Sequence, residues 1–263
     1  MVDFIISKMR SKKLRIVAVL PAYNAAGSLQ RFLADFPFKI FDEVILVDDD
    51  SEDATFKIAK RYVGSPTSPL GLRGIKIKIF RNSRNLGYGG NMKRCLDLAL
   101  KSKADIVVEI HPDGEYGFDG ILPGIREMKR GADLVLGNRF YSRFSALRSG
   151  MYVWKIPVTK GLTWIGNLVL GTKIPDLHQG FRLYSKDLLK RVDYQNFSND
   201  FLFTFELIVE VVKNGLKIRN VPVTTFYSGR KRGVDLSTSI NYSLRTIQIL
   251  LYFKTKRLKF SVE

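Results

Sequence analysis

The chain has 263 residues, 45% of them hydrophobic, which is enough to bury a core and argues against disorder along its whole length. Lys and Arg total 43 against 25 Asp and Glu, and the resulting net charge of +18 favours anionic partners such as phosphorylated substrates, anionic lipids or nucleic acid. The single cysteine, Cys95, excludes an intramolecular disulfide framework and a cysteine-rich zinc site, and it fits a reducing compartment.

The first 137 residues are predicted to alternate strands with helices. Apolar runs predict strands at 14–20, 42–50, 75–80, 104–110 and 132–137. Helices are predicted from Ser28 to about Phe36, from about Asp53 to Tyr62, and after the glycines of NLGYGG (85–90). The Pro, Gly and Ser residues of 63–74 indicate a loop. This alternation predicts an α/β fold with a mostly parallel central sheet and helices on both faces.

The second half of the chain has a different character. A short strand is predicted at 180–185, a helix at 201–215 and another strand at 216–223. The segment 151–171 is long, apolar and nearly uncharged, and its two tryptophans suit the headgroup level of a membrane. A core helix of a soluble protein explains this segment about as well.

A basic amphipathic helix is predicted from Ser239 to Phe260. Its apolar face is expected to carry Ile240, Leu244, Ile247 and Leu251. Its basic residues suit anionic lipid: Arg245, Lys254, Lys256, Arg257 and Lys259. The N-terminus does not resemble a signal peptide and no run reaches 18 apolar residues, so no transmembrane helix is expected. We therefore expect a cytoplasmic protein attached peripherally to the cytoplasmic face of a membrane.

Polar motifs follow three of the predicted strands. PAYNAAG comes after the first strand, VDDDSEDAT after the second and HPDGE after the fourth. Because the carboxyl ends of parallel strands share one edge of a sheet, these motifs are predicted to converge on one crevice. The dinucleotide fingerprint GxGxxG is absent after the first strand, which argues against a dehydrogenase.

Six motifs together resemble those of family 2 glycosyltransferases. In chain order they are VAVLPAYNAAGSL, EVILVDDDSEDAT, RNSRNLGYGGN, IVVEIHPDGEY, LVLGNRF and DLHQGFRLYS. The closest resemblance is to the polyprenyl-phosphate sugar transferases of the dolichyl-phosphate mannose synthase type, over about residues 14–225. The resemblance implies a GT-A domain over 1–230, with a nucleotide-sugar part at about 14–137 and an acceptor part at about 138–230. The residues 231–263 then form the C-terminal amphipathic helix.

The resemblance implies a donor site at the first three motifs. Pro21, Ala22 and Tyr23 would line the nucleoside pocket, Asp48 or Asp49 would bind the base, and Asn85 and Gly87 would also contact the donor. A solvated turn with a helix N-cap is the alternative for the three aspartates 48–50. Where the family has Glu, this chain has Ala25, so one donor contact is missing or supplied elsewhere.

HPDGE occupies the place of the family's Asp-x-Asp-x-Gln metal motif. His111 stands at the first Asp, Asp113 at the second and Glu115 at the Gln. A divalent cation, Mg²⁺ or Mn²⁺, would neutralise the leaving diphosphate. Asp113 is predicted to be the direct ligand and Glu115 the second. His111 would favour Mn²⁺ as a ligand, or would hydrogen-bond the diphosphate instead. A strand-end histidine satisfied by the backbone is the structural alternative.

The acceptor side is predicted from its cations. Arg139 and Arg182 match family positions and suit a phosphate, which a guanidinium binds in bidentate fashion. Five further cations are weaker candidates that also fit a surface loop: Arg143, Arg148, Arg230, Lys231 and Arg232. Asp176 is predicted to be a base or an orienting residue, with a structural role nearly as plausible. His178 and Gln179 are weaker candidates.

These residues predict an inverting, metal-dependent transfer of a sugar from a UDP- or GDP-sugar to a polyprenyl phosphate, dolichyl or undecaprenyl. The alternative is a family 2 enzyme that glycosylates a hydroxyl group of a saccharide or glycan, which needs a general base. A non-catalytic nucleotide-sugar binder is a third possibility, because His111 and Ala25 depart from the family pattern. Nucleic-acid binding is not expected, since the basic residues are spread along the chain without a recognised motif.

Overall fold

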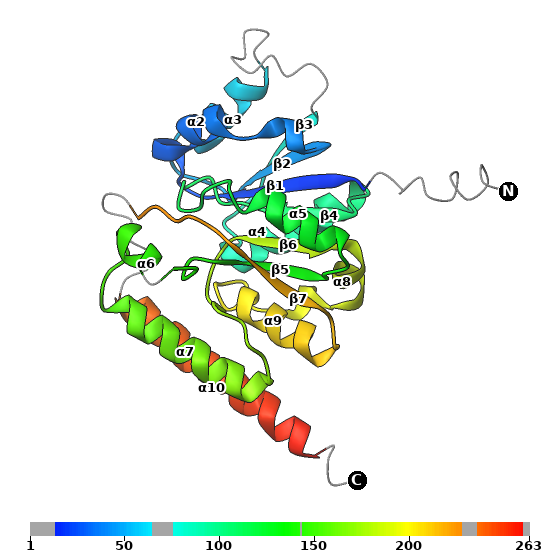
Figure 1. The fold of residues 1–263 in the computed structure, drawn as a ribbon. Helices are drawn as coiled ribbons and strands as arrows, with labels where there is room; N and C mark the ends of the chain where they lie inside the picture. The colour runs from blue at the N-terminus through cyan, green and yellow to red at the C-terminus, as the bar shows by residue number, and fades with distance from the viewer. Residues whose placement is uncertain (1–13, 65–75, 143, 228–235, 260–263) are drawn as a thin grey trace, which may run out of the picture.

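The computed structural model describes residues 14–64, 76–142, 144–227 and 236–259. Within them seven strands form one sheet: β1 (Ile16–Ala22), β2 (Glu43–Asp48), β3 (Lys76–Arg81), β4 (Ile106–Glu109), β5 (Leu134–Asn138), β6 (Arg182–Ser185) and β7 (Ile218–Pro222). Their order across the sheet is β3-β2-β1-β4-β6-β5-β7 (Figure 1). The predicted strands are therefore confirmed, each to within a few residues.

Helices connect and cover these strands. Their bounds are α2 (Ala26–Asp35), α3 (Thr55–Gly64), α4 (Gly87–Lys101), α5 (Ile121–Lys129), α6 (Ser145–Arg148), α7 (Lys155–Leu170), α8 (Lys186–Arg191), α9 (Phe203–Lys213) and α10 (Leu236–Lys259), with short 3₁₀ helices at Phe38–Ile40 and Tyr194–Asn196. The apolar segment 151–171 contains α7, and the predicted C-terminal helix, α10, begins three residues earlier than expected.

Successive residues of the central strands point into two different cores. On β1, Val17 and Val19 belong to the core that includes residues of α4 and α9. Ala18 and Leu20 belong to the core that includes residues of α2 and α5. Because both faces are covered, the strands are almost continuously apolar, as buried parallel strands are. Helices on both faces of the sheet were predicted, and this is confirmed.

Strand β6 runs against its neighbours. The strands β1 to β4 pair in parallel, as do β5 and β7, whereas β6 is antiparallel to both β4 and β5. The short run GFRLYS predicted the strand but not its direction. Since β6 starts where its neighbours end, the preceding residues 176–181 arrive at the carboxyl edge of the sheet.

The helices α7 and α10 contact each other and lie side by side at the lower left of the view (Figure 1). Both present large apolar side chains to the outside. The most exposed of them are Trp164, Leu168, Ile240, Leu244, Leu251 and Tyr252. On α10 the expected apolar face therefore points mainly outward, while Thr246 and Leu250 are buried. Among the described residues, the structure contains no helix whose length and hydropathy would let it cross a bilayer.

Candidate active site

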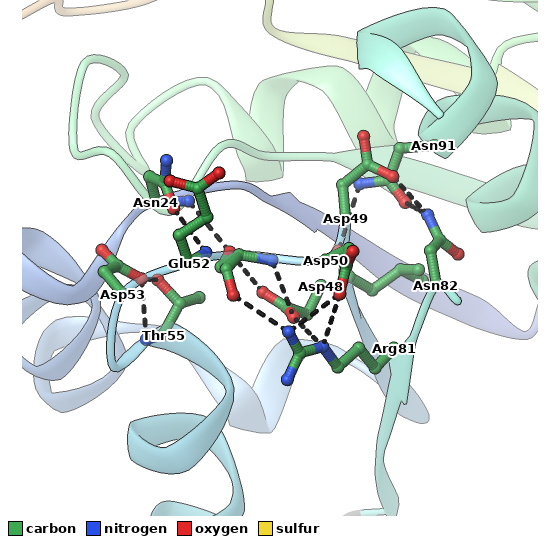
Figure 2. A network of polar contacts seen from close by, with 12 residues as sticks. Asn24, Asp48, Asp49, Asp50, Glu52, Asp53, Thr55, Arg81, Asn82 and Asn91 are labelled. Atoms are coloured by element: carbon green, nitrogen blue, oxygen red, sulfur yellow. Dashed lines mark hydrogen bonds and ion pairs between the residues drawn. The ribbon is translucent and has the colours of Figure 1, made fainter. Parts of the chain in front are cut away.

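Two carboxylates at the end of β2 are held inside the protein. Asp48 and Asp49 are almost completely buried, so the alternative of a solvated turn is wrong for this pair. Asp48 is fully engaged: Oδ1 accepts a hydrogen bond from the Ser51 hydroxyl, and Oδ2 lies 3.3 Å from Nε of Arg81 (Figure 2). At the start of α3 the hydrogen bond comes from a different acid, because Oδ1 of Asp53 accepts from the backbone N–H of Thr55 at 2.9 Å.

Asp49 keeps one oxygen available. Its Oδ1 accepts from the side-chain amide of Asn82 (2.5 Å) and from the backbone N–H of Leu86 (2.9 Å). Asn82 is itself bonded to Asn91, which donates to the carbonyl of Val47, so the group is rigid (Figure 2). No described residue hydrogen-bonds to Oδ2. Asp49 is therefore better placed than Asp48 to accept a hydrogen bond from a base.

The rest of the predicted donor site surrounds the same strand ends. Pro21 and Ala22 are buried in β1, whereas Tyr23 is 47% exposed. Ala25 is buried in the core, and its backbone N–H donates to Thr55 Oγ1 at 2.7 Å. At the position where the family has Glu, this protein therefore has a small side chain that packs in the hydrophobic core.

The third motif forms the first turn of α4. Asn85 Oδ1 accepts from the backbone N–H of Gly87 at 2.8 Å. Gly87 has a φ of +76°, and a Cβ there would lie 2.6 Å from the carbonyl oxygen of Asn199. The glycine is needed for backbone conformation and for close packing, whatever else the motif binds.

The predicted metal motif lies on the turn after β4. Asp113 is exposed and uses Oδ1 to accept the backbone N–H of Glu115 at 2.9 Å. Burial and the neighbouring charge of Asp113 raise the pKa of Glu115, an unfavourable proximity that a bound cation would relieve. In the described part of the chain, no three His, Cys, Asp or Glu side chains form a cluster able to hold a metal. Mg²⁺ commonly needs only one or two carboxylates when substrate phosphates supply further oxygens, so the two acids fit such an ion.

His111 is turned toward another residue, Glu109, which the sequence reasoning did not select. The His111 Nε2 lies 2.9 Å from Oε1 of Glu109, and the structural alternative of a backbone-satisfied histidine is wrong. Burial lowers the pKa of His111, but the hydrogen bond and charge of Glu109 outweigh it and the net pKa is raised. An acid inside the apolar run IVVEI was the signal available in the sequence.

Arg139 and Asp176 form a buried ion pair. Nε of Arg139 lies 2.7 Å from Oδ2 of Asp176. The same guanidinium donates to the Tyr227 hydroxyl (2.8 Å) and to the His178 carbonyl (2.9 Å), and Asp176 also accepts the backbone N–H of His178. The carboxylate is fully buried, with Oδ1 hydrogen-bonded to the His178 N–H and Oδ2 ion-paired with Arg139. The geometry therefore suits an orienting role better than a free base.

Arg182 is the first residue of β6 and is 1% exposed. Within the described residues, its Nε and Nη1 have no hydrogen-bond partner, and the nearest carboxylate oxygen, Oε1 of Glu109, is 3.8 Å away. A buried guanidinium with unbonded nitrogens is costly, because each buried donor that loses water without replacement is penalised. An anionic ligand would satisfy these donors.

One cavity of about 280 Å³ brings the predicted metal motif and the predicted acceptor cations together. Its polar end contains His111, Asp113, Glu115, Arg139, His178, Gln179 and Arg182. Its apolar wall comes from α7 and the preceding turn: Met151, Trp154, Val158 and Leu162. The helix α10 completes it with Thr238, Ser239, Tyr242 and Ser243. The residues at the ends of β1 and β2 do not line this cavity.

Of the weaker acceptor-side candidates in the described residues, His178 and Gln179 line the cavity. Arg148 is exposed on α6 and does not line the cavity. Arg143, Arg230, Lys231 and Arg232 lie outside the described residues, as does the predicted loop from residue 65 onward. His178 lies under α10, where its Nδ1 is 2.9 Å from the Tyr242 hydroxyl. Burial, reinforced by the charges of Arg139 and Arg182, lowers the pKa of His178 to about 3.

Relatives with known names share most of the length of this chain. It is 27% identical to a UDP-N-acetylglucosamine–dolichyl-phosphate N-acetylglucosaminyltransferase of Methanococcus voltae over 89% of this chain and 95% of that protein. It is 22% identical to a polyprenol monophosphomannose synthase of Mycolicibacterium smegmatis, over 86% of this chain and 82% of that protein. An undecaprenyl-phosphate mannosyltransferase of Micrococcus luteus is 26% identical, over 80% of this chain and 83% of that protein.

Solved structures show the same fold. The glucosyl-3-phosphoglycerate synthase of Mycobacterium tuberculosis, solved with Mn²⁺, UDP and phosphoglyceric acid, aligns with a TM-score of 0.61 at 19% identity, over 92% of this chain and 79% of that one. The expected GT-A fold is thereby confirmed. Residues 17–193, more than half of the chain, match the family described as Glycosyl transferase family 2. The protein belongs to glycosyltransferase family 2 and is a glycosyltransferase.

Proposed function

We propose that the protein transfers one sugar, with inversion, from a UDP- or GDP-sugar to a polyprenyl phosphate with the help of Mg²⁺ or Mn²⁺. One observation carries this proposal: the buried guanidinium groups of Arg139 and Arg182 lie at the polar end of a cavity whose other wall is apolar. A polyprenyl phosphate has the matching chemistry, an anionic head on a hydrocarbon chain. The relatives named above act, by their names, on lipid phosphates of this class.

The donor is proposed to span two groups of residues. Tyr23 and the free Oδ2 of Asp49 would receive the base at the ends of β1 and β2. Asp113 and Glu115 would hold the cation beside the diphosphate, where it would act as a Lewis acid on the leaving group. With Nε2 already donating to Glu109, which also raises the pKa of His111, the protonated ring would donate its Nδ1–H to a diphosphate oxygen.

The acceptor needs positioning more than it needs a base. The second pKa of a phosphate monoester is about 6, so the acceptor is mostly dianionic at neutral pH and its oxygen is already nucleophilic. Arg139 and Arg182 would neutralise it and direct one oxygen toward the anomeric carbon. Attack from the side opposite the leaving diphosphate gives inversion in a single displacement. Asp176, paired with Arg139, would orient the guanidinium.

The exposed apolar residues of α7 and α10 support attachment to a membrane. Trp164 and Leu168 are 67% and 70% exposed, and neighbouring α10 carries further exposed apolar residues. Because these two helices also wall the cavity, a bilayer against them would bring a lipid acceptor to its entrance. We propose the cytoplasmic face, where nucleotide-sugars are made.

The test is a purified assay with labelled UDP- and GDP-sugars. Undecaprenyl phosphate and dolichyl phosphate in detergent are offered in parallel with a soluble saccharide and with 3-phosphoglycerate. A labelled product that partitions into organic solvent only when lipid phosphate is present supports the proposal. Equal transfer to a soluble acceptor without lipid overturns it and favours the hydroxyl-acceptor alternative.

A further inference from the structure

Four polar side chains share the buried carboxylate of Glu109. Its Oε1 accepts hydrogen bonds from the Tyr88 hydroxyl (2.6 Å) and from His111 Nε2 (2.9 Å), and its Oε2 accepts one from the Tyr184 hydroxyl. Nη1 of Arg182 lies 3.8 Å from Oε1. The carboxylate is fully buried and does not line the cavity, whereas Tyr88, His111 and Arg182 all do.

Burial of a glutamate at this position is unfavourable for the free energy of folding. Glu109 is the last residue of β4 and pairs in register with Arg182 of β6. Val107, two residues earlier on the same face of the strand, packs in the apolar core. Burying a carboxylate costs several kcal/mol unless charges and hydrogen bonds compensate, and apolar replacements of buried ion pairs are often neutral or stabilising. Stability alone therefore does not account for the acid.

The contacts of Glu109 set the orientation of the His111 ring. Glu109 accepts the Tyr88 and Tyr184 hydroxyl groups and lies beside the guanidinium of Arg182, a set of partners that suits a carboxylate. A carboxylate only accepts hydrogen bonds, and His111 Nε2 must therefore donate. Tyr88 stacks on the imidazole, with centroids 5.5 Å apart and an angle of 20° between the rings, and it blocks one face. The ring nitrogen left for a ligand is Nδ1.

We propose that Glu109 is a positioning residue of the donor site, which fixes the His111 ring through Nε2 so that Nδ1 faces the donor diphosphate. The same carboxylate holds Arg182 at the acceptor end of the cavity, and it thereby links the two substrate positions. The identity of the diphosphate rests on the proposed function. The alternative is that Glu109 only balances the charge of Arg182. In that case any contact of His111 with the diphosphate would not depend on Glu109.

Nuclear magnetic resonance of ligand-free protein tests the orientation directly. The chain contains only two histidines, so ¹⁵N-histidine labelling reports on His111 and His178 alone, and His111→Gln assigns the signals. We expect a protonated, hydrogen-bonded Nε2 for His111 in the wild type. Glu109→Gln should shift this signal, because a neutral amide is a weaker acceptor. A His111 signal that does not change in Glu109→Gln overturns the proposal.

A double-mutant cycle tests whether Glu109 acts through His111. Binding of UDP and of GDP, each with Mn²⁺, is measured by calorimetry for Glu109→Gln, His111→Gln and the double variant. Each single change is expected to weaken binding about 10- to 100-fold, as loss of a partner behind a ligand-binding residue does. The double variant should bind no more weakly than His111→Gln alone. The proposal is contradicted if the two losses of affinity multiply in the double variant. It is also contradicted if Glu109→Gln binds the nucleotides as tightly as the wild type does.

Glu43→Gln is a matched control. Glu43 is also a buried strand glutamate with two cationic partners, Arg15 and Lys78, each at 2.8 Å, but it begins β2 at the opposite edge of the sheet. It should lose stability comparably while nucleotide binding stays unchanged. If Glu109→Gln does not fold, Tyr88→Phe replaces it in the cycle, because it removes one hydrogen bond from the same oxygen. Wild-type protein that binds neither nucleotide overturns the proposed function, and the resonance experiment still decides the orientation.

Discussion

Arg139 and Asp176 are joined inside the protein, with 2.7 Å between Nε and Oδ2 and both side chains almost inaccessible to water. Removal of one partner leaves a buried charge that water does not reach, which typically costs about 3–5 kcal/mol. The pair therefore contributes to the stability of the fold and also positions Arg139, which lines the cavity.

We expect Asp176→Asn to lower the free energy of unfolding by about 3–5 kcal/mol in urea titrations, because Arg139 loses its counter-ion. The surface pair of Glu127 and Arg130, with 2.7 Å between Nη1 and Oε1, provides the control. Since Arg130 is largely exposed, Glu127→Gln should cost less than about 1 kcal/mol. Equal losses for the two variants would contradict this picture.

Asp113→Asn is expected to remove the metal-dependent step. The change deletes a carboxylate charge while it preserves shape, and it should lower turnover by about 100-fold or more, since metal stabilisation of a leaving group is worth several kcal/mol. Binding of Mn²⁺ in the presence of UDP, followed by electron paramagnetic resonance, gives a readout independent of turnover. Asp119→Asn serves as the comparison, because Asp119 is also exposed but binds Thr224. If Asp113→Asn retains both Mn²⁺ binding and activity, the assignment of the metal site is wrong.

The apolar surface of α7 predicts the behaviour of two substitutions. Trp164→Ser and Leu168→Ser should each weaken binding to anionic lipid vesicles by about fivefold, which corresponds to about 1 kcal/mol of partial apolar burial. Leu122→Ser is the matched control, because Leu122 is 54% exposed on α5. Sedimentation with vesicles measures the effect, and identical binding by all three variants would exclude α7 as the membrane contact.

The lowered pKa of His178 should make the free energy of unfolding depend on pH. Its pKa in the folded protein is about 3, against 6.5 for the ordinary side chain, so the unfolded chain binds more protons between these values. Stability should therefore fall as the pH is lowered from about 6.5 toward 3, by at most about 1.4 kcal/mol per pH unit from this residue. Urea unfolding from pH 7 to pH 4 should show a smaller decline for His178→Gln. An unchanged slope would mean that the histidine is not buried in neutral form.

The pattern of apolar residues in the sequence was sufficient to predict most of the architecture. Near-continuous apolar runs such as IVAVLPA and EVILVD are what parallel strands covered on both faces require, and the structure places them as β1 and β2. The direction of β6 was not predictable, because four residues carry no information on orientation and the antiparallel insertion depends on pairing with β4 and β5.

The candidate site was predicted only in part for a similar reason. Strand ends marked the turn that carries Asp113, but contacts that select one oxygen over another arise from tertiary packing. Asp48 and Asp49 look equivalent in VDDDS, yet Ser51 and Arg81 occupy the first while one oxygen of the second stays available. Glu109 escaped notice because an acid in a strand is normally interpreted as a solvent-facing residue.

The completion of the cavity by α10 has a consequence for how the protein is made. Ribosomes deliver the amino-terminal segments first, and domains fold as their residues emerge. All seven described strands precede α10 in the chain, so the carboxyl edge of the sheet, where we propose that the nucleotide binds, can assemble while Tyr242 and Ser239 are still untranslated. A nascent chain halted before residue 236 is thus expected to bind a nucleotide yet lack a closed compartment for the proposed lipid acceptor, and competence for transfer would arrive only after α10 has been synthesised.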